Sequence, residues 1–183
     1  GSLPVFHFLE RELTTMSKPF VAILMGSESD LTIMQAAGDI FTTLAIDYEI
    51  KITSAHRTPA ITQQYISDAE ARGCQVFIAG AGLAAHLAGA TAAHTTRPVI
   101  GVPIDAGPLQ GMDSLLSTVQ MPAGIPVATV AIGKTGAKNA AYLAAQIMAL
   151  GDAELAQRVK DERQANADRV QAQDKALQDS RRS

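Results

Sequence analysis

The segment Ser54-Ala-His-Arg-Thr-Pro59 contains the residue types best suited to chemistry on a phosphorylated molecule. It separates an apolar run from a helical pattern, so we expect a strand-to-helix turn in which Thr58 caps the helix and the following proline begins it. The free N–H groups of a helix start attract anions, and Ser54 and Arg57 add donors that suit a phosphate monoester. His56 lies among them, and imidazole exchanges protons near neutral pH.

A second polar loop, Gly26-Ser-Glu-Ser-Asp30, follows an earlier apolar run and also precedes a helical pattern. The hydroxyls of Ser27 and Ser29 suit phosphate, and the carboxylate of Asp30 suits the hydroxyls of a sugar. In the alternative interpretation Ser29 or Asp30 only caps the next helix, although capping and ligand binding can coexist.

A third loop, Ala79-Gly-Ala-Gly-Leu-Ala-Ala-His86, combines glycines with a histidine. Gly80 and Gly82 would let the backbone approach a ligand closely. His86 then begins a helix, where it is either a second polar group of the site or a helix-face residue satisfied by its neighbours. His94, near the end of the same helix, has no comparable surroundings and receives no role.

Alternating apolar runs and helical patterns must position these loops. The runs that read as strands are 20–25, 48–52, 76–79, 99–102 and 127–132. Helical periodicity occupies 31–44, 60–72, 84–95, 113–119 and 137–150, followed by an amphipathic C-terminal helix at 152–178. This alternation predicts an α/β fold, a three-layer αβα sandwich around a flavodoxin-like, parallel five-stranded sheet in the order 2-1-3-4-5. Ligands of such folds bind beyond the carboxyl ends of the strands, where the three loops lie.

Composition sets broader limits. A chain of 183 residues with 47% hydrophobic content fits one globular domain. A net charge of −3 and a pI near 5.8 provide no basic surface for nucleic acid or for an anionic membrane. The single cysteine, Cys74, cannot form an internal disulfide, and no apolar stretch is long enough to span a bilayer. A cytoplasmic location is therefore expected.

The first residues differ in character from the rest. Gly1-Ser2 reads as a tag remnant, and Met16 reads as a natural start. We therefore expect 1–17 to be a disordered extension and 18–183 to form the single domain, which includes the helical segment 152–178.

Other nucleotide motifs fit less well. Gly80-x-Gly82-x-x-Ala85 with Asp105 approximates a dinucleotide fingerprint, but it follows the third strand instead of the first and leaves the Ser54–Pro59 segment unexplained. Gly133-Lys-Thr resembles the end of a P-loop, but the residues before it form an apolar strand, which argues against ATP. No metal is expected, because the candidate histidines lack ligand partners at helical spacing.

Four motifs in order resemble those of the N5-carboxyaminoimidazole ribonucleotide mutase family, from about residue 20 to residue 150. They are Met25-Gly-Ser-x-Ser-Asp30, Ser54-Ala-His-Arg-Thr-Pro59, Ala79-Gly-Ala-Gly-x-Ala-Ala-His86 and Asp113-Ser-Leu-Leu-Ser-x-Val-Gln-Met-Pro122. The resemblance implies a flavodoxin-like homo-octamer in purine biosynthesis. It also implies a small-molecule nucleotide substrate, whose carboxylate moves from the exocyclic nitrogen to C4 of aminoimidazole ribonucleotide without ATP, biotin or metal.

The resemblance also implies roles for individual residues. His56 would be the general acid and base. The 5′-phosphate and ribose would be bound by Ser27, Ser54 and Arg57, with Ser29 alongside and Asp30 on the ribose. The carboxylate or carbon dioxide would lie against Gly80, Ala81, Gly82, His86 and Leu87.

The sequence departs from the family pattern at three positions. Leu83 stands where glycine is usual, Ala88 where proline is usual and Leu31 where tryptophan is usual. Leu83 matters most, because it places a side chain in a loop whose backbone should approach the carboxylate. Two alternatives remain: a carboxylase that uses free carbon dioxide, and a nucleotide- or flavin-binding module without catalysis. The C-terminal segment 152–183 is expected to pack on a neighbouring subunit.

Overall fold

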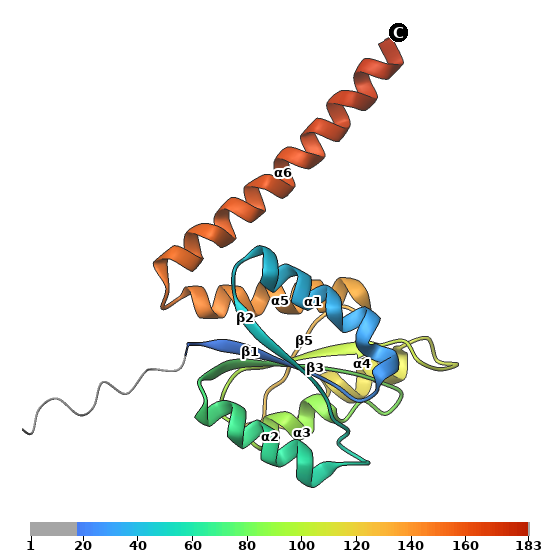
Figure 1. Ribbon diagram of the computed structural model, residues 1–183. Helices are drawn as coiled ribbons and strands as arrows, with labels where there is room; N and C mark the ends of the chain where they lie inside the picture. Colours follow the sequence, from blue (N-terminus) through green and yellow to red (C-terminus); the bar gives the residue numbers. More distant parts are fainter. Residues whose placement is uncertain (1–17, 183) are drawn as a thin grey trace, which may run out of the picture.

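The computed structural model describes residues 18–182, and the predicted extension 1–17 lies outside these described residues. Figure 1 shows a central sheet with α1 and α5 on one face and α2 and α3 on the other. The strands are β1 (Phe20–Met25), β2 (Asp47–Ile52), β3 (Cys74–Gly82), β4 (Val99–Ile104) and β5 (Ala128–Thr129). The helices are the short 3-10 helix η1 (Glu28–Asp30), α1 (Leu31–Thr43), α2 (Pro59–Ala71), α3 (Leu87–Ala93), α4 (Met112–Val119), α5 (Lys134–Ala149) and α6 (Ala153–Arg182).

The sheet has the predicted order, β2-β1-β3-β4-β5, and each of its strand pairs is parallel. Met25 of β1 is in register with Ile52 of β2 and with Gly80 of β3, so these three strands reach the same edge. The loops that leave this carboxyl edge are the three polar or glycine-rich loops of the sequence. The flavodoxin-like prediction is confirmed.

The strand β1 explains why the runs are almost continuously apolar. Its six residues are all buried. Val21, Ile23 and Met25 pack with α1 and α5, and the alternate residues Phe20, Ala22 and Leu24 pack with α2 and α3. Each fully buried aliphatic side chain contributes about 1.5–3 kcal/mol, so the centre of the sheet is a rigid base for the loops beyond it.

Several element boundaries differ from the prediction, among them those of the last strand and of the helix after β3. The strand expected at 127–132 shrinks to Ala128 and Thr129, because only these residues pair with β4 before the chain leaves the sheet. The helix expected at 84–95 begins only at Leu87. There β3 continues to Gly82, and the chain then turns at Leu83, which has a left-handed φ of 57°. Residues 84–86 are therefore loop.

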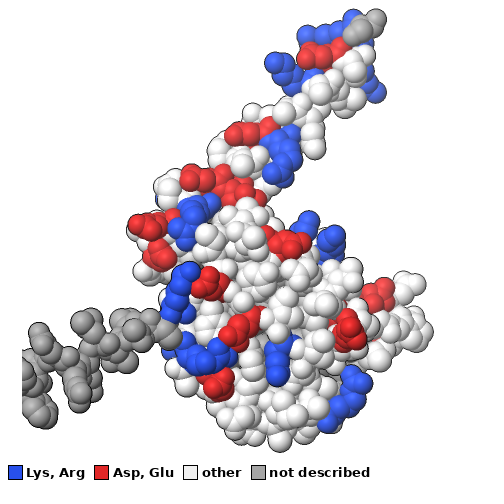
Figure 2. All heavy atoms as spheres, in the orientation of Figure 1, with Lys and Arg blue, Asp and Glu red and all other residues white. Residues whose placement is uncertain are grey.

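The last helix, α6, has two unlike halves. Near its start Leu155 is buried, and the Arg158 guanidinium donates to the carbonyl of Leu44 at 2.9 Å. Farther along, Val170 and Leu177 are exposed, and the helix projects away from the sheet (Figure 1). Basic and acidic side chains are interspersed along the projecting half (Figure 2). No helix within 18–182 is long and apolar enough to cross a membrane.

Candidate active site

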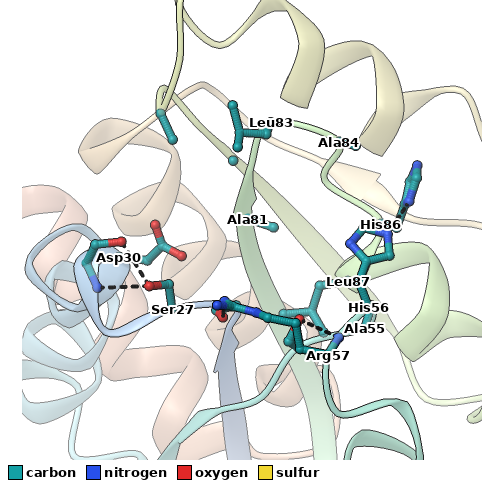
Figure 3. A pocket seen from close by; sticks show the side chains of 15 residues that line it. Ser27, Asp30, Ala55, His56, Arg57, Ala81, Leu83, Ala84, His86 and Leu87 are labelled. Carbon is teal, nitrogen blue, oxygen red and sulfur yellow. Dashed lines mark hydrogen bonds between the residues drawn. The ribbon is translucent and has the colours of Figure 1, made fainter.

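A cleft of about 630 Å³ opens at the carboxyl edge, between the loops that follow β1, β2, β3 and β4 (Figure 3). Its lining residues are Gly26, Ser27, Ser29, Asp30, Ser54, Ala55, His56, Arg57, Ala81, Gly82, Leu83, Ala84, His86, Leu87 and Ala106. The predicted site residues thus come together in one cleft, with the exception of Gly80. A Cβ on Gly80 would lie 2.4 Å from the Met34 sulfur, so this glycine allows β3 to pack against α1.

The turn before α2 is closed by its own side chains. The Ser54 N–H donates to the Thr58 hydroxyl at 2.9 Å, and the Arg57 N–H donates to the Ser54 hydroxyl at 3.1 Å. Thr58 occupies the predicted cap position and Pro59 begins the helix, but no side chain caps the N–H groups of α2. The predicted capping by the Thr58 hydroxyl is therefore wrong, because that hydroxyl bonds back to Ser54.

The Arg57 side chain joins two of the loops. Its guanidinium donates to the carbonyl oxygen of Gly26 at 2.9 Å, which holds the turn before α2 against the loop after β1. Arg57 is exposed, and no carboxylate among residues 18–182 forms an ion pair with it. A guanidinium has five N–H donors, so Arg57 retains donors and an uncompensated charge for an anion in the cleft.

The loop after β1 supplies two hydroxyls and a buried carboxylate. The Ser27 hydroxyl oxygen accepts from the Ser29 N–H at 3.4 Å and from the Ser29 hydroxyl at 3.1 Å. Ser27 thus caps η1, and neither Ser29 nor Asp30 caps the next helix through its side chain. Asp30 is 7% exposed. Burial raises the pKa of the Asp30 carboxyl, and a hydrogen bond from the Ser27 backbone partly opposes this effect.

The two histidines of the cleft contact each other. Nε2 of His56 and Nδ1 of His86 lie 2.7 Å apart, and the rings meet edge to face at 83°. A hydrogen bond between two ring nitrogens requires one donor and one acceptor, so at least one of these rings is neutral. The sequence placed both histidines after strands, but β1 lies between β2 and β3, so their direct contact was missed.

The end of the cleft away from the serines is mainly apolar. Ala81, Leu83, Ala84 and Leu87 come from β3 and the segment after it, and Ala106 comes from the loop after β4. Neither Ala84 nor Ala106 was predicted from the sequence to belong to the site. Their only signal was the small size of residues close to a glycine-rich segment.

Helix α4 supports the segment after β3 from behind. The Ala85 N–H donates to the Ser117 hydroxyl at 2.9 Å, and the Thr118 hydroxyl lies 3.5 Å from the Ala85 carbonyl oxygen. Ser117, which accepts here, and Thr118, which donates, both lie in the segment of the fourth motif of the sequence. The motif therefore positions the wall of the cleft, and neither Ser117 nor Thr118 lines it.

The remaining reactive groups lie elsewhere. Cys74 is buried at the start of β3, and burial raises the pKa of its thiol to about 11. Within 18–182 no three histidine, cysteine, aspartate or glutamate side chains are grouped to hold a metal ion. The proton-transfer groups of the cleft are therefore the two imidazoles, with the Asp30 carboxyl at its other side.

Comparison with known proteins agrees with this arrangement. A family described as AIR carboxylase matches residues 20–169. The chain is 56% identical over 149 residues to the N5-carboxyaminoimidazole ribonucleotide mutase of Bacillus subtilis (strain 168), an alignment that covers 81% of this chain and 91% of the relative. It is 55% identical over 150 residues to the protein of that name from Escherichia coli (strain K12), with 82% and 89% covered.

Solved structures show the same fold. The crystal structure of Treponema denticola PurE is similar to this chain with a TM-score of 0.79 at 34% identity. The match covers 87% of this chain and 99% of that chain. The family match at residues 20–169 extends over the five strands and the four loops that form the cleft.

Proposed function

The chain belongs to the AIR carboxylase family, and we propose that it acts in purine biosynthesis as the mutase that converts N5-carboxyaminoimidazole ribonucleotide to 4-carboxy-5-aminoimidazole ribonucleotide. The observation that carries this proposal is the convergence of a guanidinium without a paired carboxylate, serine hydroxyls and a histidine pair in one cleft. Those groups suit a phosphorylated substrate that needs proton transfer but no external nucleophile. The curated relatives of that name support the reaction.

The polar end of the cleft suits the phosphoribosyl part. Arg57 and the hydroxyls of Ser27 and Ser54 would bind the 5′-phosphate, with Ser29 beside them. The Asp30 carboxylate would accept hydrogen bonds from the ribose hydroxyls, and these bonds would offset the free-energy cost of burying its charge. The aminoimidazole then extends toward the apolar end.

The reaction requires that one proton be given to the substrate and that one proton be removed from it later. His56 as imidazolium protonates the carbamate nitrogen, the N–C bond breaks with its electron pair retained on nitrogen, and neutral carbon dioxide forms. C4 of the electron-rich ring then bonds to carbon dioxide, which becomes a carboxylate. His56 takes the proton that C4 loses and returns to its starting state. Carbon dioxide released against Ala81, Gly82 and Leu87 would stay close to C4 at high effective concentration.

His86 acts in this proposal as a positioning residue. Its Nδ1 contacts the His56 ring 2.7 Å away, which restricts the rotation of that ring and selects which of its nitrogens is protonated. A fixed ring is useful because the same imidazole must reach the exocyclic nitrogen first and C4 later.

We propose in addition that the protein is a cytoplasmic homo-oligomer, and that this oligomer is an octamer. Leu109, Met112, Leu116 and Val119 on and beside α4 are each between 44% and 61% exposed. A cluster of exposed large apolar residues favours contact with another subunit. The cysteine is free and buried, which suits a reducing compartment.

The decisive experiment follows the carboxylate. N5-carboxyaminoimidazole ribonucleotide with a ¹³C-labelled carboxylate is mixed with the protein in unlabelled bicarbonate without ATP, and NMR locates the label. Label at C4 would support the mutase. Unlabelled carboxylate at C4 would favour a carboxylase that uses free carbon dioxide, and absence of product would leave a binding module. The His56→Asn protein is the control for contaminating enzymes.

A further inference from the structure

Leu83 combines two features that are unfavourable in isolation. Its φ of 57° lies in the left-handed region, where a non-glycine residue is strained. Its side chain is also 52% exposed, although it is large and apolar. Figure 3 shows this side chain at the edge of the cleft, across from Ser27 and Arg57. Strain and apolar exposure at one position in a cleft indicate a role with the ligand.

The surroundings of Leu83 leave room for its side chain. A Cβ on Gly107 would lie 2.6 Å from the Leu83 Cδ2 atom, with no other atom within 4 Å, so Gly107 makes space for this leucine alone. The backbone just beyond it is held, because the Ala85 N–H is bonded to Ser117. The Leu83 side chain can therefore adjust its rotamer to a ligand while the loop behind it stays in place.

The other apolar lining residues cannot provide the same contact. Ala81, Ala84 and Ala106 are small, and Leu87 is only 2% exposed. Leu83 is consequently the one large apolar side chain of the lining with substantial surface still open to solvent. A flat heterocycle that enters this end of the cleft would cover that surface.

We infer that Leu83 is a specificity-determining residue, whose side chain packs on the heterocycle of the bound nucleotide and strengthens binding of ligands that carry a base. This inference rests on the proposed function, because the phosphoribosyl group must occupy the polar end for the base to reach Leu83. The contact acts on substrate and product alike, so it lowers KM and leaves kcat unchanged.

The test compares two ligands and three variants. Calorimetric titration measures the affinities for 4-carboxy-5-aminoimidazole ribonucleotide and for ribose 5-phosphate, which lacks the base. Leu83→Ala removes the covering atoms and keeps the strained backbone, whereas Leu83→Gly removes the side chain and the strain. The control is Leu177→Ala on the projecting half of α6, where the leucine has the same 52% exposure outside the cleft.

We expect Leu83→Ala and Leu83→Gly to weaken binding of the nucleotide about tenfold, the loss typical of about half a leucine side chain returned to water. Both variants should bind ribose 5-phosphate like the unmodified protein, with KM raised and kcat retained. Leu83→Gly should also melt roughly 2–4 °C higher, because glycine adopts the left-handed backbone without strain. Leu177→Ala should change none of these affinities.

Unchanged nucleotide affinity in both variants would overturn the inference, and so would equal weakening for the two ligands. If the unmodified protein itself binds the nucleotide no better than ribose 5-phosphate, the proposed function falls and the inference falls with it. Leu83→Gly keeps the test valid should Leu83→Ala fold poorly, because glycine adopts the backbone of this turn without strain.

Discussion

Two arginines at opposite ends of α2 have opposite environments. Arg57, just before the helix, lies at the carboxyl edge of the sheet and donates to one backbone carbonyl. Arg72, just after the helix, lies at the amino edge and pairs with both Glu49 and Asp68, while its guanidinium also lies 5.1 Å from the centre of the Phe20 ring. The two differ in how much of their charge the protein itself compensates.

We infer from this difference that Arg57 is a binding group and Arg72 a structural one. Paired carboxylates hold the pKa of Arg72 above its ordinary value and the pKa of Glu49 below its ordinary value. Arg57 has no such carboxylate within 18–182, so its charge stays available for the phosphate that we propose. The carboxyl edge should therefore tolerate substitutions in stability but not in function, and the amino edge should show the reverse.

The substitution with the largest expected effect is His56→Asn, at the carboxyl edge. Asparagine removes the proton donor and acceptor, so kcat should fall on the order of 10² to 10⁴. Nucleotide affinity and melting temperature should stay close to those of the unmodified protein, since His56 is exposed. Assays of product formation over time measure kcat, and calorimetric titration measures the nucleotide affinity. A loss of affinity as large as the loss of kcat would place His56 in binding instead of proton transfer.

The same substitution at the two arginines is the most direct comparison. Arg57→Lys keeps the charge but loses the planar fork, so affinity for ribose 5-phosphate should fall about tenfold to a hundredfold without loss of stability. Arg72→Lys should leave that affinity unchanged. It should lower the free energy of unfolding by about 1 kcal/mol, a small value because solvent screens a pair whose side chains are 41% and 39% exposed.

Titration of both variants with ribose 5-phosphate, followed by urea unfolding, completes the comparison. Equal effects of the two substitutions on binding would remove the distinction between the two edges. The result would then point to a general electrostatic contribution of positive charge instead of a direct contact.

Asp30→Asn should separate function from stability within the carboxyl edge itself. The folded-state pKa of Asp30 is raised, so the folded protein binds the proton more tightly, and its stability declines as the pH rises above about 3.8 toward the folded value. Asparagine cannot ionise, so the free energy of unfolding at pH 7 should increase. Nucleotide affinity should fall about tenfold with the loss of a charged acceptor for the ribose. Reduced stability in urea unfolding at pH 7 would contradict this account.

The smallest expected effect is the acid dependence of the amino edge. The folded-state pKa of Glu49 is lowered, mainly by its hydrogen bond with Arg72, so its contribution is complete above about pH 4.5 and is lost as the pH falls through the folded value. Glu49→Gln should remove this part of the pH dependence, which amounts to about 0.5–1 kcal/mol for such an exposed pair. Unfolding curves from pH 3 to pH 7 measure it. An unchanged pH profile would show that Glu49 contributes nothing to acid lability.

Much of the fold and the site could be predicted because periodicity and loop composition are local properties. The continuous apolar run of β1 and the helix patterns beside it predict a covered parallel strand, and the order of elements then brings the three loops to one edge. The roles of single atoms could not be predicted, because they depend on neighbours far apart in the chain. The contact of His56 with His86 and the bond from Arg57 to Gly26 each join separate loops.

The other differences between prediction and structure arise where one residue can make either of two local interactions or adopt either of two local conformations. The Thr58 hydroxyl could cap α2 or close the turn on Ser54, and composition does not distinguish these choices. Gly80 was assigned to the ligand because glycine permits close approach, but the close approach is to Met34. The left-handed turn at Leu83 was invisible in the sequence, since leucine rarely adopts that conformation.

The close packing of Leu83 on Gly107 also constrains which residues can replace these two in related sequences. The added Cβ at position 107 would meet only the Leu83 side chain, so a larger residue there becomes acceptable once position 83 is small. The reverse order of changes would pass through a crowded intermediate. Positions 83 and 107 should therefore covary, with leucine at 83 accompanied by glycine at 107 and glycine at 83 permitting alanine or larger residues at 107.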